Sequence, residues 1–408
     1  MTQRRLRITA VADSDSYLKL ACAQLDRLGP EWERRVVLVR SPLLPTALQL
    51  RSAVSGTFME GRTPAILQTH RLAAELRETD VVFAAATGPV AQEVFYRMSR
   101  ARGPRAGRGA TRPALVSALP GVAYPATEKA LRYRALGDAF ITHSHAESRA
   151  FSELAESLDT DTRILLGRLP FLGSPARPTS VTVPIRRVVF AAQAKMPFER
   201  AERERVLLSL ADTALGHPGL DVVVKLRAYA GEPQTHLERH PYDSLWRDLV
   251  DSGRVTDGSV RFAAGPMSTV LEPGTALATV SSTAVIEALD RGLPAVVLGD
   301  FGVSERLLNQ VFAGSGLLGT LDDVAALDFR QPHREWLRDN YFHTEHVGLG
   351  DLLAQLAERS RAGKLTVDAS ALTSARRRAA RSRVRTALPR PLLDLLRGIR
   401  HRAAASAT

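Results

Sequence analysis

The sequence predicts an α/β protein with two doubly wound domains in tandem and a helical C-terminal tail. Short apolar runs rich in β-branched residues alternate with stretches of helical period over residues 6–167. The same alternation restarts after residues 169–184, which contain four prolines and have the composition of a linker. A chain of 408 residues is also too long for one ordinary core. We therefore expect domains over 1–175 and 185–365, and a basic, partly helical or disordered tail over 366–408.

The first domain is expected to alternate strands and helices. The strands are predicted over residues 6–12, 35–40, 80–86, 114–119, 138–143 and 162–167. The helices are predicted over residues 17–28, 64–77, 89–98, 128–136 and 144–158. Pro64 supports the second of these helices, because proline suits a first helical turn. The arginine- and glycine-rich stretch 99–113 reads as a surface loop.

The second domain repeats this alternation. Its strands are predicted over residues 186–193, 221–227, 259–265, 275–280 and 295–299. Its helices are predicted over residues 199–215, 242–252, 267–272, 284–292 and 304–312. Beyond Asp322 the chain is expected to be mostly helical, with Trp336, Tyr341 and Phe342 as packing anchors.

Residues 275–302 form one strand–helix–strand unit that the rest of the chain is organised around. A right-handed parallel crossover places Ser281, Ser282 and Thr283 at the carboxyl end of a strand and the amino end of a helix. Backbone N–H groups, hydroxyls and the positive helix end converge there, so a phosphate is the expected ligand. Glu287, about one helical turn further on, is placed to reach a ribose hydroxyl. The alternative is that the hydroxyls only cap the helix and Glu287 is a surface charge.

Cations are predicted on the same rim of the second domain, because ligands of such sheets bind beyond the carboxyl ends of the strands. Lys195 and Lys225, together with Arg227, face the hydroxyl-rich helix start and complete a candidate diphosphate site, to which Asp300 also belongs. The alternative is that these cations are solvated strand ends. No GxGxxG string directly follows a predicted strand, and no P-loop is present, which argues against a dinucleotide dehydrogenase or an NTPase.

On these residues the chain resembles the GT-B glycosyltransferases, which use nucleotide sugars and have two Rossmann-like domains. The matching positions are Ser281-Ser282-Thr283, Glu287, Gly292-Leu293-Pro294 and Asp300. The chain is also similar, over most of residues 1–365, to an uncharacterised actinobacterial family of glycosyltransferases. The resemblance implies that the second domain binds the donor and the first the acceptor, with no cofactor and no catalytic metal. Glycerophosphate or polyol-phosphate transferases and nucleotide-sugar epimerases on the same scaffold are alternatives.

A glycosyltransferase that inverts the configuration of the anomeric carbon needs a base that takes the proton of the acceptor hydroxyl. We expect this base on the rim of the first domain. Asp13 and Asp15 follow the first predicted strand and are the leading candidates, and His143 follows the fifth. The alternatives are that one aspartate caps the following helix and that the histidine is structural.

The net charge of +12 is concentrated in the tail. Residues 371–402 hold ten arginines and one acid, and the net charge without them is +3. We expect this segment to attach the protein to an anionic membrane surface near a lipid-linked acceptor. A disordered tail and a polybasic nucleic-acid-binding protein are the alternatives, although no nucleic-acid-binding motif is present. The single cysteine, Cys22, and the lack of a long apolar run or a signal peptide indicate a cytoplasmic protein at most peripheral to the membrane.

Overall fold

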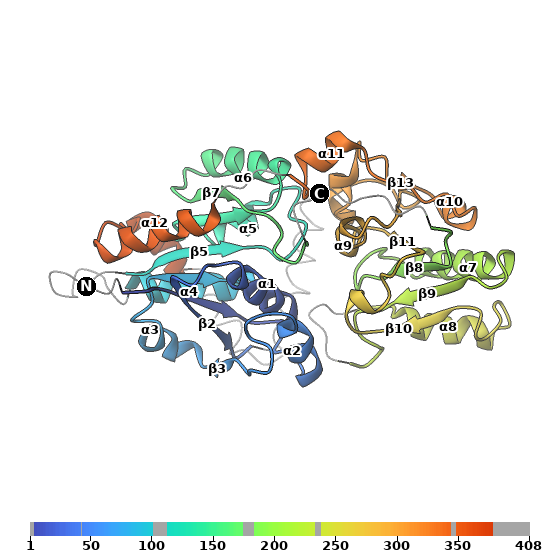
Figure 1. Ribbon diagram of the computed structural model, residues 1–408, viewed down its shortest axis with the longest axis horizontal. Coiled ribbons are helices and arrows are strands. Elements are labelled where there is room, and N and C mark those ends of the chain that lie inside the picture. Colours follow the sequence, from blue (N-terminus) through green and yellow to red (C-terminus); the bar gives the residue numbers. More distant parts are fainter. Residues whose placement is uncertain are drawn as a thin grey trace, which may run out of the picture.

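Two parallel sheets form the protein in the computed structural model (Figure 1). It describes residues 4–41, 43–100, 112–173, 183–232, 238–343 and 348–377. The two sheets lie in separate α/β halves, the first coloured blue to green and the second green to orange in Figure 1. The predicted fold class is confirmed.

The first sheet has seven strands in the order β3-β2-β1-β4-β5-β6-β7, all parallel. The strands are β1 (Leu6–Ala12), β2 (Trp32–Val39), β3 (Ala65–Leu67), β4 (Val81–Ala84), β5 (Ala114–Ala118), β6 (Ala139–Thr142) and β7 (Arg163–Leu166). The helices between them are α1 (Asp15–Asp26), α2 (Ala47–Val54), η1 (Thr69–Arg71), α3 (Leu72–Glu75), α4 (Gly88–Arg100), α5 (Glu128–Arg132) and α6 (His145–Ser157). The strand order reverses between β1 and β4, which defines the switch point where such sheets bind ligands.

The second sheet has six strands in the order β10-β9-β8-β11-β12-β13, also parallel. The strands are β8 (Arg187–Ala191), β9 (Asp221–Lys225), β10 (Arg261–Ala263), β11 (Thr275–Thr279), β12 (Ala295–Leu298) and β13 (Leu318–Gly319). The helices are α7 (Arg200–Gly216), α8 (Tyr242–Asp251), η2 (Met267–Thr269), α9 (Ala284–Asp290), η3 (Glu305–Leu307), η4 (Gln310–Phe312), α10 (Leu321–Ala325), α11 (Arg334–Asp339) and α12 (Leu349–Arg361). Its switch point lies between β8 and β11.

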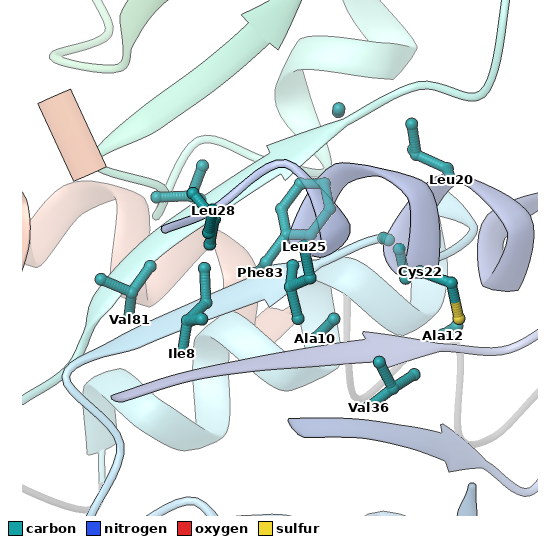
Figure 2. Close-up of a cluster of buried hydrophobic side chains, with 14 of the residues drawn as sticks. Ile8, Ala10, Ala12, Leu20, Cys22, Leu25, Leu28, Val36, Val81 and Phe83 are labelled. Carbon is teal, nitrogen blue, oxygen red and sulfur yellow. The ribbon is translucent and has the colours of Figure 1, made fainter. Parts of the chain in front are cut away.

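Helix α1 shows how the sequence pattern builds the core. Leu25 of α1, and Leu28 just after the helix, point toward Ile8, Val81 and other apolar side chains of the sheet (Figure 2). Each such side chain contributes roughly 1.5–3 kcal/mol when it is fully buried. The opposite face of α1 is therefore left for polar residues that turn toward the second domain.

Helix α12 returns to the first domain, beside β5 and away from the second sheet (Figure 1). Leu353, Leu356 and Ala357 join the core of the first sheet, and Arg361 forms an ion pair with Asp80 at 2.8 Å. This packing departs from the expected domain range 185–365, because it assigns residues 349–361 to the first half. The other domain limits stay a prediction.

Three predicted helices are wrong. Residues 267–272 contain only the 3₁₀ turn η2. Residues 64–77 contain the edge strand β3, where Leu67 accepts a hydrogen bond from the backbone of Arg40 at 3.0 Å, followed by η1 and α3. Residues 304–312 form two 3₁₀ turns, because Leu308 adopts a left-handed backbone (φ 58°) that ends the first of them. Trp336, Tyr341 and Phe342 are buried in the core of the second domain, as predicted.

Candidate functional site

The loops at the carboxyl ends of the two sheets face each other. Arg227, two residues beyond β9, donates a hydrogen bond to Ser16 Oγ of α1 at 3.1 Å and lies 3.6 Å from Asp15 Oδ2. Thr283, before α9, approaches Gly121 so closely that a Cβ on that glycine would lie 2.5 Å from Thr283 Oγ1. Gly121 also has a φ of +102°, which an L side chain rarely adopts. The predicted rim of the second domain is thus in contact with the first domain.

The hydroxyl-rich segment is held by Gln193, which follows β8 across the switch point. Gln193 Oε1 accepts a hydrogen bond from the Ser281 backbone at 2.9 Å, and its Nε2 donates to Ser281 Oγ at 3.1 Å. Ser282 Oγ accepts a hydrogen bond from the Ala284 backbone at 3.2 Å, whereas Thr283, the N-cap residue of α9, makes no side-chain cap bond. Ser281 is nearly buried, whereas Ser282 and Thr283 are partly exposed.

Lys225 ends β9 with its ammonium group buried. Its Nζ donates to the carbonyl oxygens of Leu226, at 3.4 Å, and of Gly265. Burial lowers the pKa of Lys225 to about 8, and the carboxylate of Glu287 opposes this shift. The Lys225 ammonium thus lies near one carboxylate and donates to two backbone carbonyls, which already compensate part of its charge.

Lys195 and Glu287 are the two remaining cation and acid candidates for the donor site, and Glu287 lies at the interdomain contact. Lys195, in the loop after β8, is exposed and has no hydrogen-bond or ion-pair partner in the described part of the chain. Glu287 forms an ion pair of 3.3 Å with Lys19 of α1, in the other domain. The structure thus brings Lys225, Arg227, Thr283 and Glu287 to one region.

Asp300 is not brought into this group. Its Oδ1 accepts a hydrogen bond from Arg205 of α7 at 2.9 Å, and its Oδ2 accepts from the backbone of Leu321 at 3.0 Å. Both carboxylate oxygens therefore tie the loop after β12 to α7 and α10. Only 4% of the side chain is exposed.

Asp13 is buried below the rim of the first domain. Its carboxylate accepts hydrogen bonds from the backbone of Thr87, at 3.1 and 3.2 Å, and from the Thr87 hydroxyl. Burial raises the pKa of Asp13, and the bonds from Thr87 and the charge of Arg134 act in the opposite direction. Asp13 thus fixes the loop after β4 at the first switch point, whereas Asp15 is partly exposed and faces Arg227.

His143 lies inside the first domain. Its Nδ1 is 3.2 Å from the carbonyl oxygen of Gly167, and its Nε2 is 3.1 Å from that of Leu119. Both ring nitrogens therefore face backbone acceptors and link the segments that follow β5 and β7. Neither nitrogen is turned toward the second domain.

Sequence reasoning missed several residues that organise this region. Gln193 ends the same apolar run that precedes Lys195. The expectation that ligands bind beyond the carboxyl ends of the strands could therefore have identified Gln193 as well. The roles of Lys19 and Gly121 follow from the contact between the two domains, and no local sequence pattern predicts that contact. Arg203, buried in α7, holds the loop after β8 by donating to the carbonyl oxygens of Gln193, at 3.0 Å, and of Ala194, at 2.9 Å.

Within the described ranges, no group of three or more His, Cys, Asp or Glu side chains is placed to hold a metal ion. None of the helices in that part of the chain combines the length and the hydropathy needed to cross a bilayer. The tail predicted to reach a membrane lies outside the described residues from position 378 onward.

The family model described as "Putative glycosyltransferase (DUF6716)" matches residues 8–359. No curated protein matches the sequence. Among solved structures, a putative UDP-N-acetylglucosamine 2-epimerase from Listeria monocytogenes superimposes with a TM-score of 0.52 at 12% identity, over 89% of this chain and 98% of that one. The UDP complex of MnaA from S. aureus gives 0.50 at 10% identity, over 83% and 90%. A lipopolysaccharide outer core galactosyltransferase gives 0.40 at 11% identity, over 93% and 100%.

Proposed function

The chain belongs to this glycosyltransferase family, and from that premise we propose that it moves a sugar from a nucleotide-sugar donor to a cell-surface polysaccharide or a lipid-linked acceptor. One observation carries the proposal. Cations and hydroxyls that follow the strands of the second sheet meet polar residues of the first domain at the carboxyl ends of both sheets. That is where ligands of doubly wound sheets bind.

The donor's diphosphate is proposed to bind at Lys225 and Arg227, with Lys195 at the edge. Ser282 and Thr283 are partly exposed and offer hydroxyl groups to the same phosphates. Arginine and lysine donate charge-assisted hydrogen bonds that are shorter and stronger than neutral ones. Three cations on one rim would stabilise the leaving diphosphate without a catalytic metal, so full activity in EDTA is the expected result.

Asp15 is the proposed base. Of the three candidates it is the one whose carboxylate is partly exposed and faces the second domain, whereas Asp13 and His143 are buried. In an inverting reaction Asp15 would take the proton of the acceptor hydroxyl as its oxygen bonds to the anomeric carbon. The bond from that carbon to the phosphate oxygen breaks, and its electron pair leaves with the nucleoside diphosphate.

Epimerisation of a nucleotide sugar is the second candidate. Two structural neighbours with TM-scores of 0.50 or more are the Listeria protein, named as an epimerase, and the UDP-bound MnaA protein. At identities of 12% and 10% these neighbours show only that the fold is shared. An assay of the reaction is therefore needed to distinguish a transferase from an epimerase.

The test begins with a thermal-shift panel of UDP-, GDP-, CDP- and CMP-linked sugars, because a ligand that binds the folded state raises the melting temperature. The sugar that binds is then incubated without an acceptor. A transferase releases the nucleotide slowly by hydrolysis and leaves every stereocentre of the sugar except the anomeric carbon unchanged. Acceptor-free interconversion of two epimers would contradict the transferase and establish the second candidate.

Association with the inner face of the plasma membrane is also proposed. It is supported by the ten arginines and the apolar stretch LLDLLRGI within residues 371–402.

A further inference from the structure

Two residues proposed to bind the donor are each held by the first helix of the other domain. Glu287 Oε1 lies 3.3 Å from Lys19 Nζ, and Arg227 donates to Ser16 Oγ at 3.1 Å. Asp15, four residues before Lys19, lies on the same face of α1 and is 3.6 Å from Arg227. One helix face therefore contacts both the acid and the cation of the donor region.

The contact between Lys19 and Glu287 is poorly suited to a purely stabilising role. The Lys19 side chain is 46% exposed, and exposed ion pairs contribute only about 0.2–1 kcal/mol. Its position is nevertheless well defined, because Nζ also lies 4.9 Å above the ring of Phe171, in the segment leading out of the first domain. Lys19 therefore fixes where the Glu287 carboxylate lies more than it stabilises the fold.

Glu287 lies near two lysines. Its carboxylate is paired with Lys19 and is near enough to Lys225 to oppose the lowering of that lysine's pKa by burial. A carboxylate accepts hydrogen bonds and donates none, so the groups that it can take from a nucleotide are hydroxyls. The ribose of a donor whose phosphates lie at Lys225 carries two of them.

We propose that Lys19 is a positioning residue of the donor site, which holds Glu287 toward the ribose hydroxyls of the nucleotide. This assignment rests on the proposed function. It makes the donor site a joint property of both domains, because the acid that recognises the ribose is oriented by α1 of the acceptor domain.

The test compares wild type with Lys19→Ala by isothermal titration with UDP and with 2′,3′-dideoxyuridine diphosphate. GDP or CDP and its dideoxy form replace them if the nucleotide panel favours another base. Lys19→Ala is expected to raise the Kd for UDP about fivefold, the equivalent of one exposed ion pair. It should leave the Kd for the dideoxy compound within about twofold, since that compound lacks the hydroxyls that Glu287 would bind. Lys129→Ala, at an exposed lysine of α5, is the matched control and should change neither.

Three results would overturn the assignment. One is an unchanged Kd for UDP in Lys19→Ala, and another is an equal loss for UDP and the dideoxy compound, which would place Lys19 on the phosphates. The third is wild-type UDP affinity in the charge-swapped variant Lys19→Glu/Glu287→Lys, which restores the ion pair but puts an ammonium where the carboxylate should be. Failure of the wild type to bind any of the nucleotides is a different outcome, which contradicts the proposed function itself.

Discussion

Lys225 and Arg227 are two residues apart, but their cations lie in different surroundings. Lys225 is buried against backbone carbonyls, whereas Arg227 is half exposed and reaches across to α1. Because ligands of such sheets bind beyond the carboxyl ends of the strands, the sequence predicts both residues on the rim of the second domain. It does not predict that one cation is buried and the other exposed. Because only the Lys225 cation is buried, pH and substitution are expected to affect the two residues differently.

The affinity for the donor is expected to depend on the charge of Lys225. Burial lowers its pKa to about 8, so the ammonium is lost as the pH rises through that value, well below the usual pKa near 10.5. We expect the Kd for UDP to increase between pH 7 and 9.5, measured by titration calorimetry. The phosphates of UDP are already ionised in this range, since their second pKa is about 6.

Lys225→Met supplies the control for that profile and should show weak binding that is flat with pH. A wild-type profile that is equally flat would contradict the assignment of Lys225 to the diphosphate.

Arg203 illustrates a residue whose role sequence reasoning did not find. Its guanidinium is buried, and all three of its nitrogens donate hydrogen bonds. The acceptors are Glu238 and the carbonyl oxygens of Pro197, His240, Gln193 and Ala194. In the sequence it is one of many arginines in a charged helix, and only the folded loop after β8 reveals its partners.

Arg203→Ala is expected to destabilise the protein by about 3–5 kcal/mol, because it leaves a buried acid and several carbonyls without a donor. Urea unfolding monitored by circular dichroism measures this change. Arg247→Ala, at an exposed arginine of α8, should stay within about 0.5 kcal/mol of wild type. A loss below 1 kcal/mol for Arg203→Ala would show that the network is dispensable.

At the scale of elements, the start of α9 carries the contact between the domains. Thr283 lies against Gly121, in the loop after β5, and Gly121 has no room for an added methyl group. The sequence predicts the strand–helix–strand unit around this point because its apolar runs and its glycine stop are local signals. It does not predict which loop of the other domain lies opposite.

Gly121→Ala is expected to weaken the affinity for UDP by about fivefold or more, since the new Cβ displaces Thr283 and strains a backbone with φ near +102°. Titration calorimetry measures the loss. Gly216→Ala, at the end of α7 where a Cβ would meet nothing within 4 Å, should bind UDP like wild type. Equal affinities for the two variants would mean that this close approach does not shape the donor site.

Two of the elements that the sequence mispredicts share a physical cause. Residues 64–77 look helical by composition, but β3 forms because β2 offers a free edge for parallel pairing. Residues 304–312 are apolar at helical spacing, but Asn309 bonds to Gly302 and Ser304 and folds the segment into turns. Tertiary pairing and side-chain hydrogen bonds outweigh local propensity in both cases. The long buried strands, whose apolar runs are unambiguous, are predicted well.

At the scale of the molecule, the chain crosses between the domains more than once. Tyr341, in the second core, donates a hydrogen bond of 2.7 Å to Glu147 at the start of α6, and α12 then packs under the first sheet. Arg149 and Asp339 form a further ion pair of 2.7 Å between the domains. The two domains are therefore linked both at the donor rim and at this crossing.

Residues 371–402 carry nine of the twelve net positive charges of the protein, and the predicted role of this tail is to attach the protein to anionic lipid. Leu372 and Ala375 pack near Tyr96, so a truncation after Arg377 keeps this contact. The full chain is expected to float with vesicles that contain phosphatidylglycerol, because each arginine near such a surface contributes about 1 kcal/mol. Flotation of the truncated chain to the same extent would contradict this role, and vesicles of phosphatidylcholine alone serve as the control.

The central claim is that the facing rims of the two domains bind a nucleotide through the cations of the second sheet. Titration of UDP, GDP, CDP and CMP into the wild type and into Lys225→Met tests it most directly. We predict that one of the four binds the wild type with one site per chain, and that Lys225→Met weakens it at least about tenfold, or 1.4 kcal/mol, with no loss of melting temperature. Binding of none of the four, or equal binding by both proteins, would contradict the account.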